Sequence, residues 1–231
     1  MSDYLELEKI AVEIRKGIVT AVHSAKSGHP GGSLSAADLF TWLYYKELNI
    51  DPEQPLKEDR DRFVLSKGHV APGYYSTLAN RGFFPVEDLK TLRHTGSYLQ
   101  GHPDRKHIPG VDMSSGSLGQ GISAAVGMAL SAKLQKKDYR VYTLLGDGEI
   151  EEGQVWEAAM FTEKYGSIIV MENMTYAEAL PLYGLRQNIF TDPQKPMKVE
   201  AKIYPLNGAD ENSVCASRRP SGLRKTMTRP N

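Results

Sequence analysis

Residues 141–173 read VYTLLGDGEIEEGQVWEAAMFTEKYGSIIVMEN. An apolar run, VYTLL, is followed by a segment with helical patterning, EEGQVWEAAMFTEKY, and then by a second apolar run, SIIVM. Short apolar runs of this kind are typical of buried strands. A strand, a helix and a strand within about 30 residues form a βαβ unit, with parallel strands and a right-handed crossover. The stretch therefore predicts an α/β fold in which helices flank a parallel sheet.

The residues before this unit add one strand and several helices. The run RFVLS (62–66) is expected to be a short buried strand. Ser35, with Asp38 three residues later, resembles a capping box that opens a helix ending near Leu48. The segment GHPGGS (28–33) is expected to be a loop. Further helices are expected over residues 7–22, 74–82, 85–93 and 118–135, with irregular structure over residues 94–117.

The chain divides by composition into a body and a tail. Its 231 residues contain 28 Lys and Arg and 28 Asp and Glu, so the net charge indicates no class of partner. Residues 181–231 nevertheless hold nine of the basic residues, four of the acidic residues and six of the 13 prolines. We therefore expect an α/β domain over residues 1–175. Residues 176–231 should form a divergent, basic, proline-rich and irregular tail that is partly disordered, with irregular structure or disorder from about residue 206.

Several classes of protein do not fit the sequence. The single cysteine, Cys215, allows neither an internal disulfide nor a cluster of thiolate ligands. The start of the chain, MSDYLELEKI, lacks the basic and apolar parts of a signal peptide, and no apolar run approaches the ~18 residues of a membrane span. The basic tail has no interleaved aromatic residues, so nucleic acid is not expected as a partner. A cytoplasmic protein without membrane attachment is the expectation.

Both strands of the βαβ unit end in polar residues that suit a metal ion. Asp147 lies between two glycines directly after the first apolar run, and Asn173 lies two residues after the second. Ligands gather at the carboxyl ends of parallel strands, where a carboxylate and an amide oxygen suit Mg²⁺ or Ca²⁺. Such ions often keep phosphate oxygens as further ligands, which suggests a metal–diphosphate site. The alternative is that Asp147 caps the following helix.

The segment GSLGQG (116–121) leads directly into an expected helix that is rich in small residues. Backbone N–H groups at a glycine-rich helix start favour phosphate binding. The spacing G-x-x-G-x-G differs from the dinucleotide-binding motif, and no clear strand precedes it. Alternatively, the glycines serve close packing of the helix.

Three of the six histidines lie beside glycine in expected loops. They are His29 in SGHPGG, His69 in SKGHVAPG and His102 in LQGHPD. Together they suggest a cleft lined by imidazoles that hold phosphate or hydroxyl groups, although chance histidines in surface loops give the same pattern. The other three, His23, His94 and His107, are expected to be structural or exposed.

Four segments carry a family resemblance. They are, in order, SAKSGHPGGSLSAADL, DRFVLSKGHVAPGYYSTLANRG, GSLGQGISAAVGMALSAK and GDGEIEEGQVWEAAMF. Together they resemble the N-terminal, diphosphate-binding half of transketolase, especially the form encoded as a separate subunit, from about residue 5 to residue 166. The resemblance implies the diphosphate-binding (PP-type) fold of thiamine-diphosphate enzymes. It also implies thiamine diphosphate and Mg²⁺, or Ca²⁺, as cofactors.

The resemblance implies roles for single residues. His69 and His102 would lie near the diphosphate and the reactive carbon of the cofactor, and His29 would face the sugar substrate. Glu152 would join a carboxylate network that reaches the partner's cofactor-activating glutamate. The metal ion would be held by Asp147, Asn173 and the carbonyl oxygen of Thr175, and the cofactor contacted by Gly116, Ser117, Leu118 and Gly148.

The implied activity is the transfer of a two-carbon ketol unit between sugar phosphates. The family's continuation after Thr175 is not recognisable, and the pyrimidine-binding domain that supplies the activating glutamate is absent from the sequence. A separate pyrimidine-binding subunit is therefore expected, within a homo- or hetero-oligomer. The alternatives are a subunit of another thiamine-diphosphate enzyme, such as a deoxyxylulose phosphate synthase or a dehydrogenase, and a non-catalytic binding or scaffold paralogue that has lost the cofactor.

Overall fold

A computed structural model of the chain describes residues 2–165, 169–173, 189–190 and 198–199, with side chains over residues 4–162. Thr175 and most of the expected tail, including the disorder expected from about residue 206, lie outside the described residues. No helix in the described part of the chain is both long enough and apolar enough to span a membrane.

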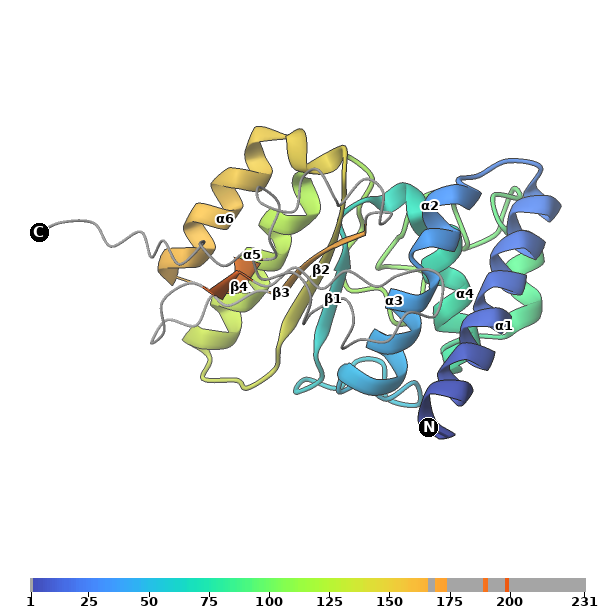
Figure 1. Cartoon of the computed structure of the whole chain (residues 1–231), viewed down its shortest axis with the longest axis horizontal. Helices are drawn as coiled ribbons and strands as arrows, with labels where there is room; N and C mark the ends of the chain where they lie inside the picture. Colours follow the sequence, from blue (N-terminus) through green and yellow to red (C-terminus); the bar gives the residue numbers. More distant parts are fainter. Residues whose placement is uncertain (1, 166–168, 174–188, 191–197, 200–231) are drawn as a thin grey trace, which may run out of the picture.

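Five strands form one sheet in the order β1-β2-β3-β4-β5 (Figure 1). β1 (Arg62–Leu65) and β3 (Ile169–Asn173) both pair in parallel with β2 (Val141–Gly146). The helix α6 (Gly153–Tyr165) connects β2 to β3, which confirms the βαβ unit and the expected parallel sheet. Two short antiparallel strands, β4 (Ile189–Phe190) and β5 (Lys198–Val199), extend the sheet beyond β3.

Most of the expected helices are present. The long amphipathic segment near the start of the chain, the segment after the first strand and the small-residue segment all form α-helices. Besides α6, the α-helices are α1 (Ser2–Ala25), α2 (Pro30–Ser35), α3 (Ala37–Trp42), α4 (Ala71–Arg81) and α5 (Gln120–Leu134). Shorter elements are a π-helical turn, η1 (Leu43–Glu47), and three 3-10 segments, η2 (Gly68–Val70), η3 (Val86–Thr91) and η4 (Glu149–Glu151).

Alternating side chains give the sheet a core on each face. Phe63 of β1 and Leu144 of β2 belong to a cluster that includes α1, α3 and α4. Val64 and Leu145, their neighbours along the strands, belong to a second cluster with α5 and α6. The two groups of helices lie on opposite sides of the sheet (Figure 1). Both faces are therefore covered, as expected for a parallel sheet.

Three local expectations were wrong. The segment GHPGGS is largely helical, because Pro30 occupies the first turn of α2, where its fixed φ favours a helix start. Ser35 and Asp38 form no capping box. The Ser35 hydroxyl donates to the Gly32 carbonyl at 3.0 Å, and Asp38 pairs with Arg15 at 2.5 Å. The helix expected from Pro85 is the 3-10 segment η3.

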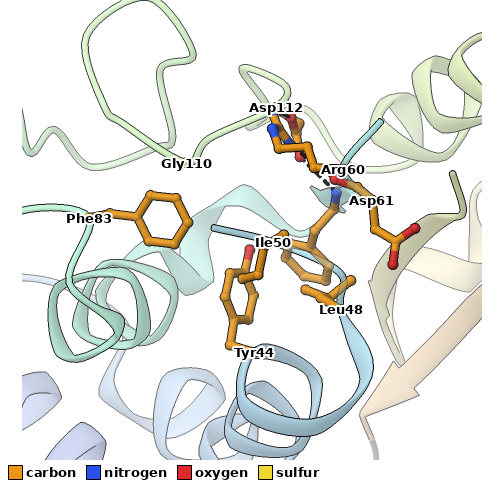
Figure 2. A pocket seen from close by; sticks show the side chains of 9 residues that line it. Tyr44, Leu48, Ile50, Arg60, Asp61, Phe83, Gly110 and Asp112 are labelled. Carbon is orange, nitrogen blue, oxygen red and sulfur yellow. Dashed lines mark hydrogen bonds and ion pairs between the residues drawn. The ribbon is translucent and has the colours of Figure 1, made fainter. Parts of the chain in front are cut away.

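A buried ion pair lies at the amino end of β1 (Figure 2). The Arg60 guanidinium donates to Asp112 at 2.5 Å, and the second carboxylate oxygen accepts from the Phe63 amide at 2.8 Å. A cavity of about 10 Å³ lies between this pair, Tyr44 and Phe83. That space suits one water molecule at most. The cavity is therefore too small for an organic ligand.

Candidate active site

Two segments meet at the carboxyl end of β1: the residues that follow the strand and the loop that leads into α5. A Cβ on Gly68, after β1, would lie 2.8 Å from the backbone of Ser115 and Gly116. A Cβ on Gly121, in the first turn of α5, would lie 2.6 Å from the Cα of Ser66. Only glycine permits such close approach between backbones. The loop before α5 is therefore held directly against the end of β1.

Asp147 lies at the end of β2 and is exposed. Its carboxylate makes no hydrogen bond with the residues that the structure describes. Gly148, with no side-chain cap, precedes η4, and α6 begins only at Gly153, so the capping alternative for Asp147 is wrong. The preceding residue, Gly146, pairs with Asn173 across β2 and β3. The two expected metal ligands thus come from the ends of neighbouring strands.

The loop before α5 offers open backbone donors. Within the described part of the chain, the N–H groups of residues 116–118 donate no hydrogen bond. Ser117 and Leu118 are exposed, and Gly119 starts the helix with a φ of +80°. Amides in this arrangement at a helix start suit a phosphate group.

The three histidines of the glycine-flanked loops lie close to one another. The rings of His29 and His69 have centroids 5.1 Å apart at an interplanar angle of 61°. A Cβ on Gly116 would lie 3.3 Å from the ring of His102, so this imidazole lies against the open amides. His23, His94 and His107 are exposed, and His107 contacts Asp104 at 2.6 Å.

The electrostatics of the site favour a neutral His69. Burial lowers the pKa of His69 below its ordinary value of 6.5. Positive charge on His29, on Lys67 and on His102 lowers this pKa further. The carboxylate of Asp147 acts in the opposite direction and is a smaller influence. A neutral imidazole keeps both a donor and an acceptor nitrogen for a ligand.

Two charged residues of the site were missed by sequence reasoning. Glu149 is 2% exposed, and its carboxylate accepts hydrogen bonds from the Ser66 hydroxyl at 2.5 Å, the Gly119 amide at 2.8 Å and the Gly146 amide at 3.0 Å. Lys67 is 4% exposed and its Cδ lies 3.3 Å from where a Cβ on Gly146 would be. Both stand among other charged or polar residues in the sequence, and no pattern there marks them as buried.

The donor set fits thiamine diphosphate with a divalent ion. The exposed Asp147 carboxylate makes no hydrogen bond within the described chain and influences the pKa of His69. The open amides lie against the His102 ring and precede Gly119, whose amide shares the Glu149 carboxylate with the Gly146 amide. Among the described residues, no group of three His, Cys, Asp or Glu side chains could hold a metal ion. A metal ion bound here would therefore need oxygen ligands of other kinds, such as amide, carbonyl and diphosphate oxygens, besides Asp147.

Comparison with known proteins identifies a matching family. The family model described as transketolase, thiamine diphosphate binding domain, matches residues 7–174. The match includes every described residue of the candidate site. It confirms the family expected from the four sequence segments.

Curated relatives include separate subunits and full-length enzymes. The chain is 47% identical over 157 residues to a 6-deoxy-6-sulfo-D-fructose transketolase subunit of Clostridium sp., covering 68% of this chain and 57% of that protein. It is 38% identical over 217 residues to an apulose-4-phosphate transketolase subunit of Actinobacillus succinogenes, covering 91% and 78%. It is 44% identical over 160 residues to transketolase of Homo sapiens, covering 69% and 26%. The chain thus spans about half of the first relative and about a quarter of the third.

Solved structures agree with these relatives. A transketolase variant from Pichia stipitis has a TM-score of 0.69 and 35% identity, covering 73% of this chain and 27% of that chain. Transketolase from Leishmania mexicana has a TM-score of 0.66 and 32% identity, covering 74% and 28%. The similarity confirms the α/β fold predicted from the sequence.

Proposed function

The chain belongs to the transketolase family, within its thiamine diphosphate-binding domain, and from this premise we propose that it is the diphosphate-binding half of a transketolase. It would transfer a two-carbon ketol unit between sugar phosphates. The observation that carries the proposal is that the Glu149 carboxylate joins Gly119, directly after the open amides of residues 116–118, to Gly146, directly before exposed Asp147. The His29–His69 pair belongs to the same end of the strands, because the Asp147 carboxylate influences the pKa of His69.

The metal site would use the neighbouring ends of β2 and β3. Asp147 would bind Mg²⁺ with Asn173 and the carbonyl oxygen of Thr175. The parallel pairing of Gly146 with Asn173 supports the first two ligands. Gly148 and the amides of residues 116–118 would bind the diphosphate, because amides at a helix start favour negative charge.

The histidines would serve the reacting end of the site. Bound thiamine diphosphate supplies the nucleophilic carbon on which the two-carbon unit is carried. His69 and His102 would lie near the diphosphate and this carbon, where neutral His69 can donate or accept one hydrogen bond. His29, exposed and in contact with His69, would face the sugar phosphate. These imidazoles would orient hydroxyl groups and move protons between substrate and solvent.

A second subunit would complete the site. Two of the relatives are named as transketolase subunits, and the match covers 57% and 78% of their lengths. We propose that the partner is a pyrimidine-binding subunit, and that the active assembly is a homo- or hetero-oligomer. Glu152, exposed and directly before α6, would face that partner.

Two measurements test the function. Isothermal titration calorimetry of the chain with thiamine diphosphate should show binding with Mg²⁺ and loss of binding with EDTA. A ketol-transfer assay with sugar phosphates should then show activity when a pyrimidine-binding subunit of a related transketolase is added. Absence of thiamine diphosphate binding in saturating Mg²⁺ would contradict the proposal and favour a paralogue that has lost the cofactor.

A further inference from the structure

We propose that Glu149 is a positioning residue, which fixes two cofactor-contacting turns, residues 116–119 and residues 146–148, relative to each other without touching cofactor or metal. The inference rests on the function proposed above. It concerns a residue to which neither the family resemblance nor the comparisons assign a role.

Three chain segments converge on the Glu149 carboxylate. One oxygen accepts from the Ser66 hydroxyl, just after β1, and from the Gly119 amide, at the start of α5. The other oxygen accepts from the Gly146 amide, the residue before Asp147. The bonded groups thus come from the end of β1, from the turn over residues 116–119 and from the turn over residues 146–148. One side chain therefore connects the two turns to each other and to the sheet.

Burial separates the role of Glu149 from that of Asp147. Glu149 is 2% exposed, whereas Asp147, two residues earlier, is exposed and makes no hydrogen bond within the described chain. A carboxylate with three donors is stable in its buried place, because hydrogen bonds to charged groups are strong and compensate for lost water. Asp147 faces solvent, where an ion can reach it. Glu149 faces the protein.

The two bonded amides belong to residues that set the direction of each turn. Gly119 has a φ of +80° and immediately follows the open amides of residues 116–118. Gly146 is the last residue of β2 and immediately precedes Asp147. Moving either glycine would displace its neighbouring cofactor ligands. Residues that hydrogen-bond to metal ligands and thereby orient them typically contribute 10–100-fold to metal affinity.

The substitution Glu149→Gln changes the charge and the hydrogen-bonding pattern of the side chain but keeps its volume. A glutamine has one acceptor oxygen and one donor NH₂ group in place of two equivalent acceptors. If its oxygen faces Ser66 and Gly119, its NH₂ faces the Gly146 amide, and two donors oppose each other. The reversed orientation produces the same conflict at the other end. In either orientation one of the two turns is released, while the side chain still fills its space.

Asp112→Asn is the matched control. Asp112 is also a buried carboxylate that accepts a backbone amide, from Phe63, but at the amino end of β1. Its partners are Arg60 and Phe63 and not Ser66, Gly119 or Gly146, so Asp112→Asn should lower stability without releasing either cofactor-contacting turn. A difference in cofactor affinity between the two variants therefore reflects the place of Glu149 in the site and not a general loss of stability.

The experiment measures amide hydrogen exchange without cofactor and thiamine diphosphate affinity in saturating Mg²⁺, on the full chain. In Glu149→Gln the amides of Gly119 or Gly146 should lose protection while those of β1 keep theirs, and the dissociation constant should rise by about 10–100-fold. Asp112→Asn should leave the dissociation constant within about twofold of the unsubstituted chain. Ser66→Ala, which removes one donor and keeps the acid, should give a smaller rise and serves if Glu149→Gln does not fold.

Two results would overturn the inference. One is unchanged exchange at both glycines in a folded Glu149→Gln protein, and the other is an equal loss of affinity in Asp112→Asn. Failure of the unsubstituted chain to bind thiamine diphosphate would refute the proposed function alone. The exchange measurement needs no cofactor, so it still decides whether Glu149 fixes the two turns.

Discussion

The rings of His29 and His69 are in edge-to-face contact, with centroids 5.1 Å apart, although 40 residues of sequence separate the two histidines. The contact places a second titratable ring beside a partly buried one. Burial is the first cause of the lowered pKa of His69, and charge on His29 is the second. His69 is therefore the residue at which the electrostatics of the site can be measured directly.

NMR titration of the histidine ring protons should give a pKa for His69 below 6.5. His29→Ala should raise this pKa, because a positive neighbour is removed. Asp147→Asn should lower it further, because a negative neighbour is removed. A lowered pKa means that the unfolded chain binds this proton more readily. His69 should thus contribute full stability above about pH 6.5 and lose it as the pH falls toward the folded value. A shift of the wrong sign in either variant would contradict the arrangement of charges.

The second prediction concerns Asp147→Ala. Because the carboxylate is exposed and makes no hydrogen bond within the described chain, its loss should change stability by no more than about 0.5 kcal/mol. Mg²⁺-dependent binding of thiamine diphosphate, measured by calorimetry, should be abolished. Asp138→Ala, which removes an exposed carboxylate near the opposite end of β2, is the control and should bind normally. Retained affinity with a lowered melting temperature in Asp147→Ala would refute its role as a metal ligand.

The parts of this site that follow strands could be predicted from the sequence, since parallel strands end at a common edge. That reasoning correctly predicted neighbouring strands, on which Gly146, the residue before Asp147, pairs with Asn173. The glycines at the start of α5 had two explanations, close packing and phosphate binding; the structure confirms packing at one of them, and phosphate binding stays a prediction. Gly121 serves packing against Ser66, whereas the amides of residues 116–118 stay open.

Burial of single charges could not be predicted in the same way. Glu149 stands in a run with Glu151 and Glu152, and nothing in its spacing distinguishes the buried acid from the exposed ones. Two of its three hydrogen-bond donors, Ser66 and Gly119, are distant in sequence, so only the fold reveals them. The helix at Pro30 was missed because neighbouring glycines normally indicate a loop.

Two glycines of α5 should respond oppositely to alanine. A Cβ on Gly121 would lie 2.6 Å from the Cα of Ser66, so Gly121→Ala must separate α5 from β1 and should lower stability by about 1–3 kcal/mol. A Cβ on Gly127 meets no described atom within 4 Å, so Gly127→Ala should raise stability by about 0.5–1 kcal/mol through the helix propensity of alanine. Chemical denaturation of both variants measures the difference. Equal effects would mean that the packing of α5 differs from the structure.

The buried Arg60–Asp112 ion pair at the amino end of β1 should be important for stability. The Arg60 and Asp112 side chains are 11% and 6% exposed, so Asp112→Ala leaves an uncompensated buried charge and should cost about 3–5 kcal/mol. Asp59→Ala removes one half of the exposed pair with Lys57 and should cost less than about 1 kcal/mol. Urea unfolding of the two variants compares them. Similar small losses would show that the Arg60–Asp112 pair is accessible to water.

The last prediction is that the purified chain binds thiamine diphosphate but transfers no ketol unit until a pyrimidine-binding subunit is added. An open half-site leaves the ring of the cofactor in water, where reactive species are not protected.

Glu152 should affect ketol transfer but not cofactor binding. The Cβ and Cγ of its side chain pack against Gly119, while the residue stays exposed to a partner. Glu152→Gln should leave cofactor affinity of the isolated chain unchanged. It should lower ketol transfer in the reconstituted pair by roughly 10²-fold, because the partner's glutamate, the acid–base group, would lose the carboxylate that orients it. Glu157→Gln, an exposed acid in the first turns of α6, is the matched control and should retain full activity in the pair. Ketol transfer by the purified chain alone would mean that a group within it replaces the partner's glutamate, and substitutions of His29, His69 and His102 would then identify that group.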